Sequence, residues 1–187
     1  MNIEKEEIIQ LTQEYGGPWG INHTRRLLYL ISCIDIGLTY DADVVWMAAH
    51  LHDWGGYSRW LQKGMDHAER SVQVAEQFLS ERGYSTLFID PVLEAIKLHH
   101  VGDPNKRIEA ILLSDADCLD FLGVVGVLRD FSKNPRDMRK AYDTALKRRD
   151  KIPQMIILDK SREIADTRIK QMDELMERFV LDSCNFF

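Results

Sequence analysis

The chain shows one dominant periodicity, that of the amphipathic α-helix. Between residues 23 and 36, apolar residues recur at spacings of three and four and form one stripe, made of Leu27, Leu30, Ile31 and Ile34. No stretch combines period-two alternation of apolar and polar residues with paired turn signals, as a half-buried strand would. We therefore predict an all-α fold without a sheet.

Breaker and capping residues divide the chain into helices. Gly16-Gly17-Pro18 ends a first helix, Gly37 ends a second, and Gly55-Gly56 ends a third that Asp41 can cap. Pro91 stands where the first position of a helix prefers proline. The predicted helices span 3–15, 23–36, 42–54, 67–82 (capped by Asp66), 91–100 and 136–149, the last of these being exposed. A long apolar segment, 106–132, is interrupted near Gly123 and Gly126. A final helix begins at Asp159 or Ser161 and runs to about 182, and its inward-facing residues are Ile164, Met172, Leu175, Met176 and Phe179.

Composition and charge narrow the class of protein. The chain has 187 residues, 45% hydrophobic and 29% charged, with a net charge of −6, so no basic footprint for duplex nucleic acid is visible. No apolar run reaches the ~18 to 20 residues of a membrane span, and the amino terminus lacks the basic and apolar regions of a signal peptide. Three widely spaced cysteines fit a reducing compartment. We expect a cytoplasmic protein that binds neither duplex nucleic acid nor membrane.

All six histidines fall within the first 100 residues. The densest signal is the segment AAHLHDWGG, in which His52 and Asp53 stand at a predicted helix end. An imidazole nitrogen and a carboxylate oxygen together suit divalent zinc, iron, manganese, cobalt or nickel. An isolated His-Asp dipeptide is common by chance, so the prediction of a metal site depends on the residues around it.

Three aspartates, Asp115, Asp117 and Asp120, interrupt the apolar segment AILLSDADCLDFLG. Carboxylates in such a place are costly to bury unless they are paired or bind a metal. Asp117 has Leu113 four residues before it and Phe121 four after it, so it shares the inward face. A cap or a salt bridge to Arg25, Arg26 or Arg107 is the alternative for Asp117, and a structural role of this kind is favoured for the other two.

The order His23, His52-Asp53, Asp117 resembles the H…HD…D signature of the HD superfamily of metal-dependent phosphohydrolases. The matching segments are NHTRRLLYL, AAHLHDWGG and SDADCLDFLG, and the resemblance covers about residues 20–130. It implies an all-α fold, one or two divalent metals and hydrolysis of a phosphoester, often in a nucleotide. We accordingly predict one HD domain over 1–187, with the metal-site core at about 20–130 and a C-terminal helical extension at about 134–187.

The resemblance also implies a ligand set. His23, His52, Asp53 and Asp117 would hold the first metal, and His67 and His99 stand where family members with two metals carry two further histidines. His100 could replace His99. The metal is left open among Fe, Mn, Zn, Co, Ni and Mg. His50 lies about 200° around the helix from His52, so we interpret it as a packing or surface residue.

Other residues are candidates for holding substrate. Asp53 would bridge two metals and so take the catalytic role, while Arg26 and then Lys63 are the leading cations for phosphate oxygens, unless each is a solvated surface charge. Tyr57 and Trp60 either stack a base or cover the core, and the sequence leaves this open.

The substrate class is constrained by Gly56. Relatives that cleave cyclic dinucleotides carry Lys at this position, so that activity is not expected here. We predict a phosphohydrolase that acts on a small phosphorylated metabolite through metal-activated water, with nucleotides the leading class. Two alternatives stay open: a regulatory module that binds ligand without turnover, and a di-iron oxygenase. The Met-bearing stripe of the last helix is either core or the surface of a homodimer.

Overall fold

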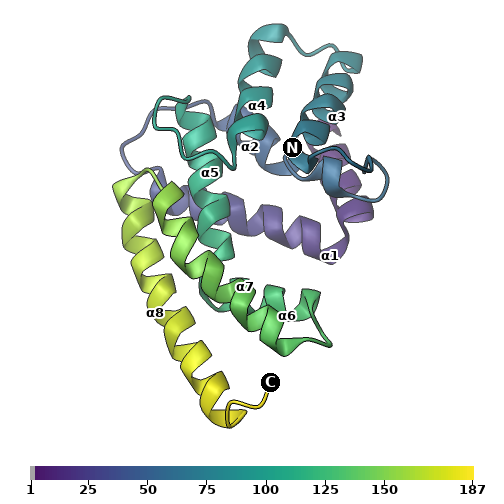
Figure 1. Cartoon of the computed structure of the whole chain (residues 1–187). Coiled ribbons are helices and arrows are strands. Elements are labelled where there is room, and N and C mark those ends of the chain that lie inside the picture. Colours follow the sequence, from purple (N-terminus) through teal and green to yellow (C-terminus); the bar gives the residue numbers. More distant parts are fainter. Residues whose placement is uncertain (1–2) are drawn as a thin grey trace. The chain divides into compact units, whose positions relative to one another are not determined.

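The computed structural model describes residues 3–187 as helices joined by loops, and this part of the chain contains no strand (Figure 1). The predicted all-α fold is confirmed. The chain divides into two compact units, one up to Ser114 and one from Asp115 onward. The helices are α1 Ile3–Ile34, α2 Ala42–Leu51, η1 Trp54–Gly56, α3 His67–Glu81, α4 Thr86–Leu98, α5 Ile108–Phe121, α6 Gly123–Lys133, α7 Met138–Lys151, η2 Ile152–Met155 and α8 Asp159–Asp182.

Helix α1 is broken where the sequence predicts a break. Gly17 has φ 63° and ψ −168°, a non-helical conformation inside an otherwise helical run. Side chains with a Cβ disfavour positive φ, whereas glycine does not. The second helical part follows directly after Gly17, because Pro18 has the φ of a first helical residue and no N–H to satisfy. The predicted start at His23 was therefore wrong by five residues.

Helix α2 is capped as predicted but ends earlier than predicted. The Asp41 carboxylate accepts hydrogen bonds from the N–H groups of Asp43 and Val44, at 2.9 and 3.2 Å. The helix closes at Leu51 and the short 3₁₀-helix η1 follows, so the predicted extent of 42–54 was wrong. The residues that it buries are almost all apolar: Val44, Val45, Met47, Ala48, Ala49, His50 and Leu51.

Gly55 serves close packing rather than helix termination. Its N–H donates to Ser71 Oγ at 2.8 Å, which brings η1 directly against α3. A Cβ at Gly55 would lie 2.5 Å from the His67 carbonyl oxygen and would collide with the Ser71 nitrogen. A larger side chain would therefore force the segment that follows Asp53 away from α3.

Helix α4 begins earlier than the position of Pro91 predicts. The helix begins at Thr86, after Ser85 in an extended conformation, and continues through Pro91, so the predicted start at Pro91 was wrong. Proline inside a helix removes the bond to the carbonyl four residues earlier, here that of Leu87. Leu87 is 88% exposed, so water can satisfy that carbonyl. By contrast α3, capped by Asp66 through the N–H of Ala68, matches the prediction closely.

In the second unit, α6 packs against both α7 and α8. Of the residues predicted to face inward on α8, Met172 and Met176 are buried, whereas Ile164, Leu175 and Phe179 are half-buried. None of the helices described is both long and apolar enough to span a bilayer. The core of this unit contains Leu119, Leu122, Val127, Ala141, Ala145, Ile152, Ile156, Ala165, Met172 and Met176.

Asp115, on α5, caps the start of α8 in place of a residue next to that helix in the sequence. The N-cap residue Leu158 has no side chain that can accept a hydrogen bond, but the fully buried Asp115 carboxylate accepts from the N–H groups of Ile157 and Leu158 at 3.0 and 2.8 Å. A carboxylate at a helix N-terminus is also favoured by the helix dipole. The structural role predicted for Asp115 matches these contacts.

We expect Asp115→Ala to lower the free energy of unfolding by about 3 kcal/mol, because two N–H groups lose their acceptor and each such loss costs about 1 to 3 kcal/mol. Asp115→Asn keeps one acceptor oxygen and should cost less. Urea denaturation followed by circular dichroism measures both. Asp166→Ala, on the exposed side of α8, is the matched control, and equal losses in Asp115→Ala and Asp166→Ala would contradict this role.

Candidate metal centre

His52 and Asp53 lie at the carboxyl end of α2, where the chain turns into η1. His52 Nδ1 lies 3.0 Å from the Ala49 carbonyl oxygen. Because a carbonyl can only accept, Nδ1 carries the proton and Nε2 keeps a lone pair, as in histidines that bind metals. His52 is buried, while 24% of the Asp53 side chain is exposed. The pair therefore offers one imidazole nitrogen and one accessible carboxylate.

His23 brings the second half of α1 to this pair. Its Nε2 lies 3.3 Å from His52 Nε2 and 3.7 Å from Asp53 Oδ2, and His52 Nε2 lies 3.6 Å from the same oxygen. Two imidazole nitrogens that face each other at this distance are held together by a shared proton or by a cation. The three ligand atoms lie within 4.8 Å of one another. This first cluster, made of His23, His52 and Asp53, fits a divalent metal in both geometry and donor type.

A second cluster contains His67, at the start of α3, with His99 and His100 at the end of α4. His67 Nε2 and His100 Nε2 are 3.0 Å apart. His99 is fully buried, and its Nδ1 lies 2.5 Å from the Ile96 carbonyl oxygen, so its Nε2 also keeps a lone pair. One nitrogen from each of the three residues lies within 4.8 Å of the others. From the sequence, His100 was predicted only as a possible replacement for His99 as a metal ligand, whereas the structure brings both residues to the cluster.

The Asp53 carboxylate faces both clusters at once. Its Oδ2 is the oxygen near His23 and His52, while its Oδ1 lies 3.8 Å from His67 Nε2. A carboxylate with one oxygen toward each cluster is the arrangement that a bridging ligand of two metals requires. The Asp66 carboxylate adds negative charge beside the same imidazole, with one oxygen 3.7 Å from His67 Nδ1.

His50 is a packing residue, one of the two roles open to it from the sequence. Its Nδ1 lies 2.8 Å from the Trp46 carbonyl oxygen, and its ring packs against the Trp46 ring, tilted by 33° with 3.9 Å between centroids. Burial lowers the pKa of His50 to about 4. It therefore stays neutral at physiological pH, on a different side of α2 from the two clusters.

The predicted ligand Asp117 lies on α5, in the second unit, and is 2% exposed. Asp120, on the same helix, is 1% exposed. The inward face predicted for Asp117 agrees with this burial. Its role as a metal ligand stays a prediction.

The two predicted phosphate-binding cations differ in their surroundings. The Arg26 guanidinium lies over the Trp19 ring, 5.4 Å from its centroid, and the Trp19 ring is parallel to the His23 ring within 10°. Arg26 is thus held near the first cluster by Trp19, an aromatic residue that the sequence analysis did not single out. Trp19 could have been identified from its position four residues before His23, one helical turn away. Lys63 is exposed in the loop before α3 and makes no hydrogen bond or ion pair within the described chain.

Tyr57 fills the notch at the break in α1. A Cβ at Gly16 or at Gly20 would lie 2.5 Å from Tyr57 atoms, so the glycines leave room for its ring. Burial, and then the charge of Asp53, raise the pKa of the Tyr57 hydroxyl well above its usual range. Tyr57 therefore remains a neutral phenol close to Asp53 and to the turn of α1 that carries His23.

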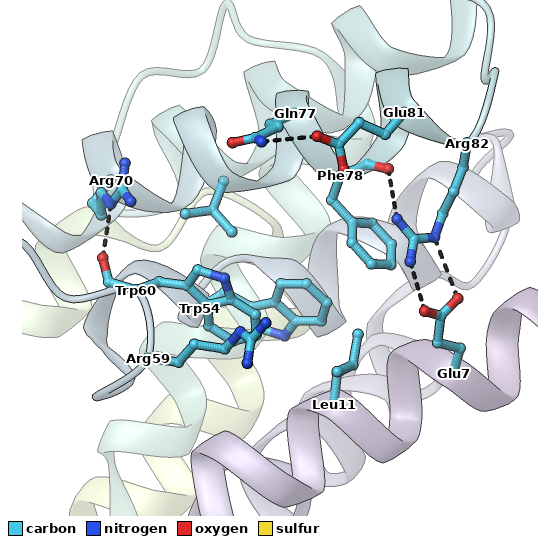
Figure 2. Close-up of a pocket in the computed structure, with 11 residues that line it drawn as sticks. Glu7, Leu11, Trp54, Arg59, Trp60, Arg70, Gln77, Phe78, Glu81 and Arg82 are labelled. Carbon is cyan, nitrogen blue, oxygen red and sulfur yellow. Dashed lines mark hydrogen bonds and ion pairs between the residues drawn. The ribbon is translucent and has the colours of Figure 1, made fainter.

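Trp60 covers part of the core, which is one of the two roles that the sequence leaves open for it. Its ring stacks on the fully buried Trp54 at 4.5 Å between centroids and within 2° of parallel (Figure 2). Trp54 in turn donates its indole N–H to Thr12 Oγ1 at 3.0 Å. One face of Trp60 thus covers the residue that follows Asp53.

Comparison with known proteins agrees with this geometry. The HD domain family matches residues 20–122, more than half of the chain, and the chain belongs to this family. The chain is similar over 97% of its length to a predicted HD superfamily hydrolase from an uncultured Thermotogales bacterium, with 25% identity, 99% of that chain covered and a TM-score of 0.68. The family supports metal-dependent hydrolase chemistry in general, and its members bind divalent metals.

Two further structures share the fold. Bacillus subtilis YpgQ, solved in complex with ADP, is 24% identical over 95% of this chain and 97% of its own, with a TM-score of 0.72. An HD-superfamily hydrolase from Bacillus thuringiensis is 19% identical over 98% of both chains, with a TM-score of 0.73. A search of curated sequences finds no match.

The notch at Gly20 can be tested by a double-mutant cycle. We expect Gly20→Ala to lower the free energy of unfolding by about 1 to 3 kcal/mol through overpacking, although alanine favours helix by about 1 kcal/mol. Because the Tyr57 hydroxyl is the nearest atom, Tyr57→Phe should reduce this loss. Chemical denaturation of the four proteins measures the coupling, and strictly additive effects would rule out the contact.

The first cluster can be tested by metal content. We expect His52→Gln to bind at least about tenfold less divalent metal than wild type, since even indirect partners of a metal change affinity about 10- to 100-fold. His50→Gln is the matched control, because His50 makes the same kind of backbone hydrogen bond on the same helix but packs on Trp46. Elemental analysis of folded protein measures both, and equal metal content would exclude His52 as a ligand.

Proposed function

We propose that this protein hydrolyses a phosphoester of a small phosphorylated metabolite, with nucleotides the leading substrate class. The observation that carries the proposal is the Asp53 carboxylate, which has one oxygen toward His23 and His52 and the other toward His67. Two clusters that share one carboxylate can hold two divalent ions. Membership of the HD family supports the same chemistry.

The protein side of the reaction follows from the ligand atoms that the site presents. A bound divalent ion lowers the pKa of water from 15.7 toward ~7 and so makes a nucleophile available at neutral pH. The Nδ1 atoms of His52 and His99 face backbone carbonyl oxygens, which leaves the Nε2 atoms of both rings as the candidate metal ligands. Asp53 contributes negative charge and an accessible carboxylate edge beside both clusters. These residues would hold the ions, and the exposed part of the Asp53 side chain leaves room for substrate beside them.

Substrate phosphate needs a positive partner beside the clusters, and Arg26 is the side chain we assign to it. A guanidinium can bind two phosphate oxygens at once. The Trp19 ring beneath Arg26 limits its freedom, so that less conformational entropy is lost on binding. Lys63 is exposed in a loop, and we assign it a weaker contribution.

The choice of nucleotides rests on two supports. Bacillus subtilis YpgQ, which shares the fold, was solved with ADP. The chain also carries the aromatic side chain of Trp19 next to Arg26, which suits a ligand with both a ring and a phosphate. We further propose that the substrate is a free small molecule rather than duplex nucleic acid, in line with the net charge of −6.

The test is a screen of phosphomonoesters, nucleotides and pyrophosphates with added Mn²⁺, Fe²⁺, Co²⁺, Ni²⁺, Zn²⁺ or Mg²⁺. We expect Asp53→Ala to lower kcat/KM by more than about 100-fold, because losing a ligand exceeds the effect of losing a partner of a ligand. Asp43→Ala, an exposed aspartate on α2, is the matched control and should retain wild-type activity. Equal phosphate release by wild type and Asp53→Ala would overturn the proposal.

A further inference from the structure

Lys106 lies in the segment that joins α4 to α5, and it is only 7% exposed. Its Nζ group donates hydrogen bonds to the carbonyl oxygens of Leu98 and Val101, at 3.1 and 2.5 Å. These two carbonyls stand directly before His99 and directly after His100 in the chain. Lys106 therefore holds both ends of the dipeptide that supplies two of the three imidazoles of the second cluster.

The ammonium group of Lys106 is stabilised by its place at the carboxyl end of α4. The last carbonyl groups of an α-helix have no N–H partner within the helix, and they form the negative end of its dipole. Burial of an ammonium group costs free energy unless hydrogen bonds replace those it made to water. Two carbonyl acceptors offset this cost here. The ammonium group is thus fixed in one place, and the carbonyl groups that it bonds are fixed with it.

The end of α4 allows His99 and His100 to reach the same cluster. Neighbouring residues in a continuous helix point about 100° apart, so their side chains diverge. The regular helix ends at Leu98, and the two histidines form a turn. The Val101 N–H closes this turn with a hydrogen bond to the Leu98 carbonyl at 3.0 Å, and the two imidazole rings lie 3.7 Å apart between centroids. The carbonyl that closes the turn is one of the two that Lys106 bonds.

The directions of the imidazole rings depend on this turn. His99 Nδ1 lies 2.5 Å from the Ile96 carbonyl oxygen. His100 Nε2 lies 3.0 Å from Nε2 of His67, which belongs to α3. Ligands of a metal must be placed to within about 0.5 Å and about 10 to 20° of the productive geometry. A shift of the backbone at either end of the dipeptide would therefore move both imidazoles relative to His67.

Separate contacts attach the rest of the segment to α4. Arg107 donates from its backbone N–H and from Nε to the two carboxylate oxygens of Glu94, at 3.2 and 2.9 Å. Within the loop, the Asp103 carboxylate accepts from the backbone N–H of Asn105 at 2.9 Å. Neither contact involves the two carbonyls that the ammonium group holds. Loss of the Lys106 ammonium group should therefore loosen the histidine turn while the segment stays attached.

We propose that Lys106 is a positioning residue for a divalent ion at the second cluster. It acts through the backbone, because the carbonyls that it holds fix the turn that directs His99 and His100 at the ion. This inference rests on the proposed function only in needing a second ion, and it holds for any phosphoester substrate. An ammonium group and a metal ion repel each other, so a purely electrostatic role would weaken binding of the ion. The positioning role has the opposite sign.

The test is isothermal titration calorimetry of the metal-free full chain with Co²⁺. We expect two binding steps in wild type, and His67→Gln identifies the step that belongs to the second cluster by weakening it. Lys106→Met should weaken that same step at least about tenfold and leave the other step unchanged, since residues that orient metal ligands change affinity about 10- to 100-fold. Lys106→Arg keeps the charge and the N–H donors, so it should recover most of this affinity.

Two further variants keep the test informative. Arg107→Met is the matched control, because it removes the neighbouring cation of the same segment, whose ion pair with Glu94 is at the surface. It should bind both ions like wild type. Lys106→Gln keeps a shorter N–H donor and should give an intermediate loss, and it replaces Lys106→Met if circular dichroism shows that Lys106→Met does not fold.

The outcomes separate this inference from the proposed function. Equal or tighter binding of the second ion by a folded Lys106 variant without the charge would overturn the inference. So would a single binding step in wild type, or equal weakening of both steps, which is the result of a general loss of stability. Two intact binding steps with no phosphate release from any substrate would contradict the proposed function alone.

Discussion

The Asp53 carboxylate sets the main electrostatic constraint on the first unit, because it stands between imidazoles from three helices. Of the five histidines in the two clusters, His23, His52 and His99 are 1% exposed or less, and His67 and His100 have ring nitrogens 3.0 Å apart. Nitrogen lone pairs that converge repel one another unless a cation or a proton lies between them. The negative charge of Asp53 favours such a cation on either side. The residues around it are best understood as supports that keep this carboxylate in place.

Those supports act through packing on both sides of the His-Asp pair. Before it, α2 buries small and branched apolar residues and presents His52 through a hydrogen bond to Ala49. After it, Gly55 lets η1 approach α3, and Trp54 is held between Thr12, Trp60 and Phe78. His52 and Trp54 directly flank Asp53, and Gly55 follows two residues after it. The position of Asp53 is therefore determined by contacts that are themselves mostly apolar.

The same packing connects two regions of different chemistry. The histidine clusters are rich in ligand atoms for hard and borderline cations, whereas beyond Trp54 the rings of Trp60 and Phe78 pack against Arg59 and Arg82. Tyr57 and Trp60 belong to the loop that runs between them. Tyr57 supports the broken α1 near His23, and Trp60 supports Trp54. One short loop therefore contributes to the positions of both His23 and Asp53.

Local features of the sequence predicted most of the helices, because the signals involved act over a few residues. Asp41 and Asp66 cap helices through the N–H groups two and three residues later, and Gly17-Pro18 breaks α1 where glycine and proline adjoin. The grouping of His23 with His52-Asp53 also followed from the sequence, through the spacing that resembles the HD superfamily. Pro91 misled the prediction, because an exposed first turn tolerates a missing hydrogen bond that a helix interior would not.

Only the tertiary structure decided what depends on residues far apart in the chain. Gly55 ends no helix but meets Ser71, sixteen residues on, and His100 joins His67 across thirty-three residues. Trp19 between Arg26 and His23, and Tyr57 against Gly16 and Gly20, have no local signature because their partners are chosen by packing. The sequence by itself determined where most of the helices form and which side chains offer atoms that a metal could use. The packing of those helices determined which lone pairs converge, since an imidazole's direction depends on the backbone carbonyl and the neighbours that it meets.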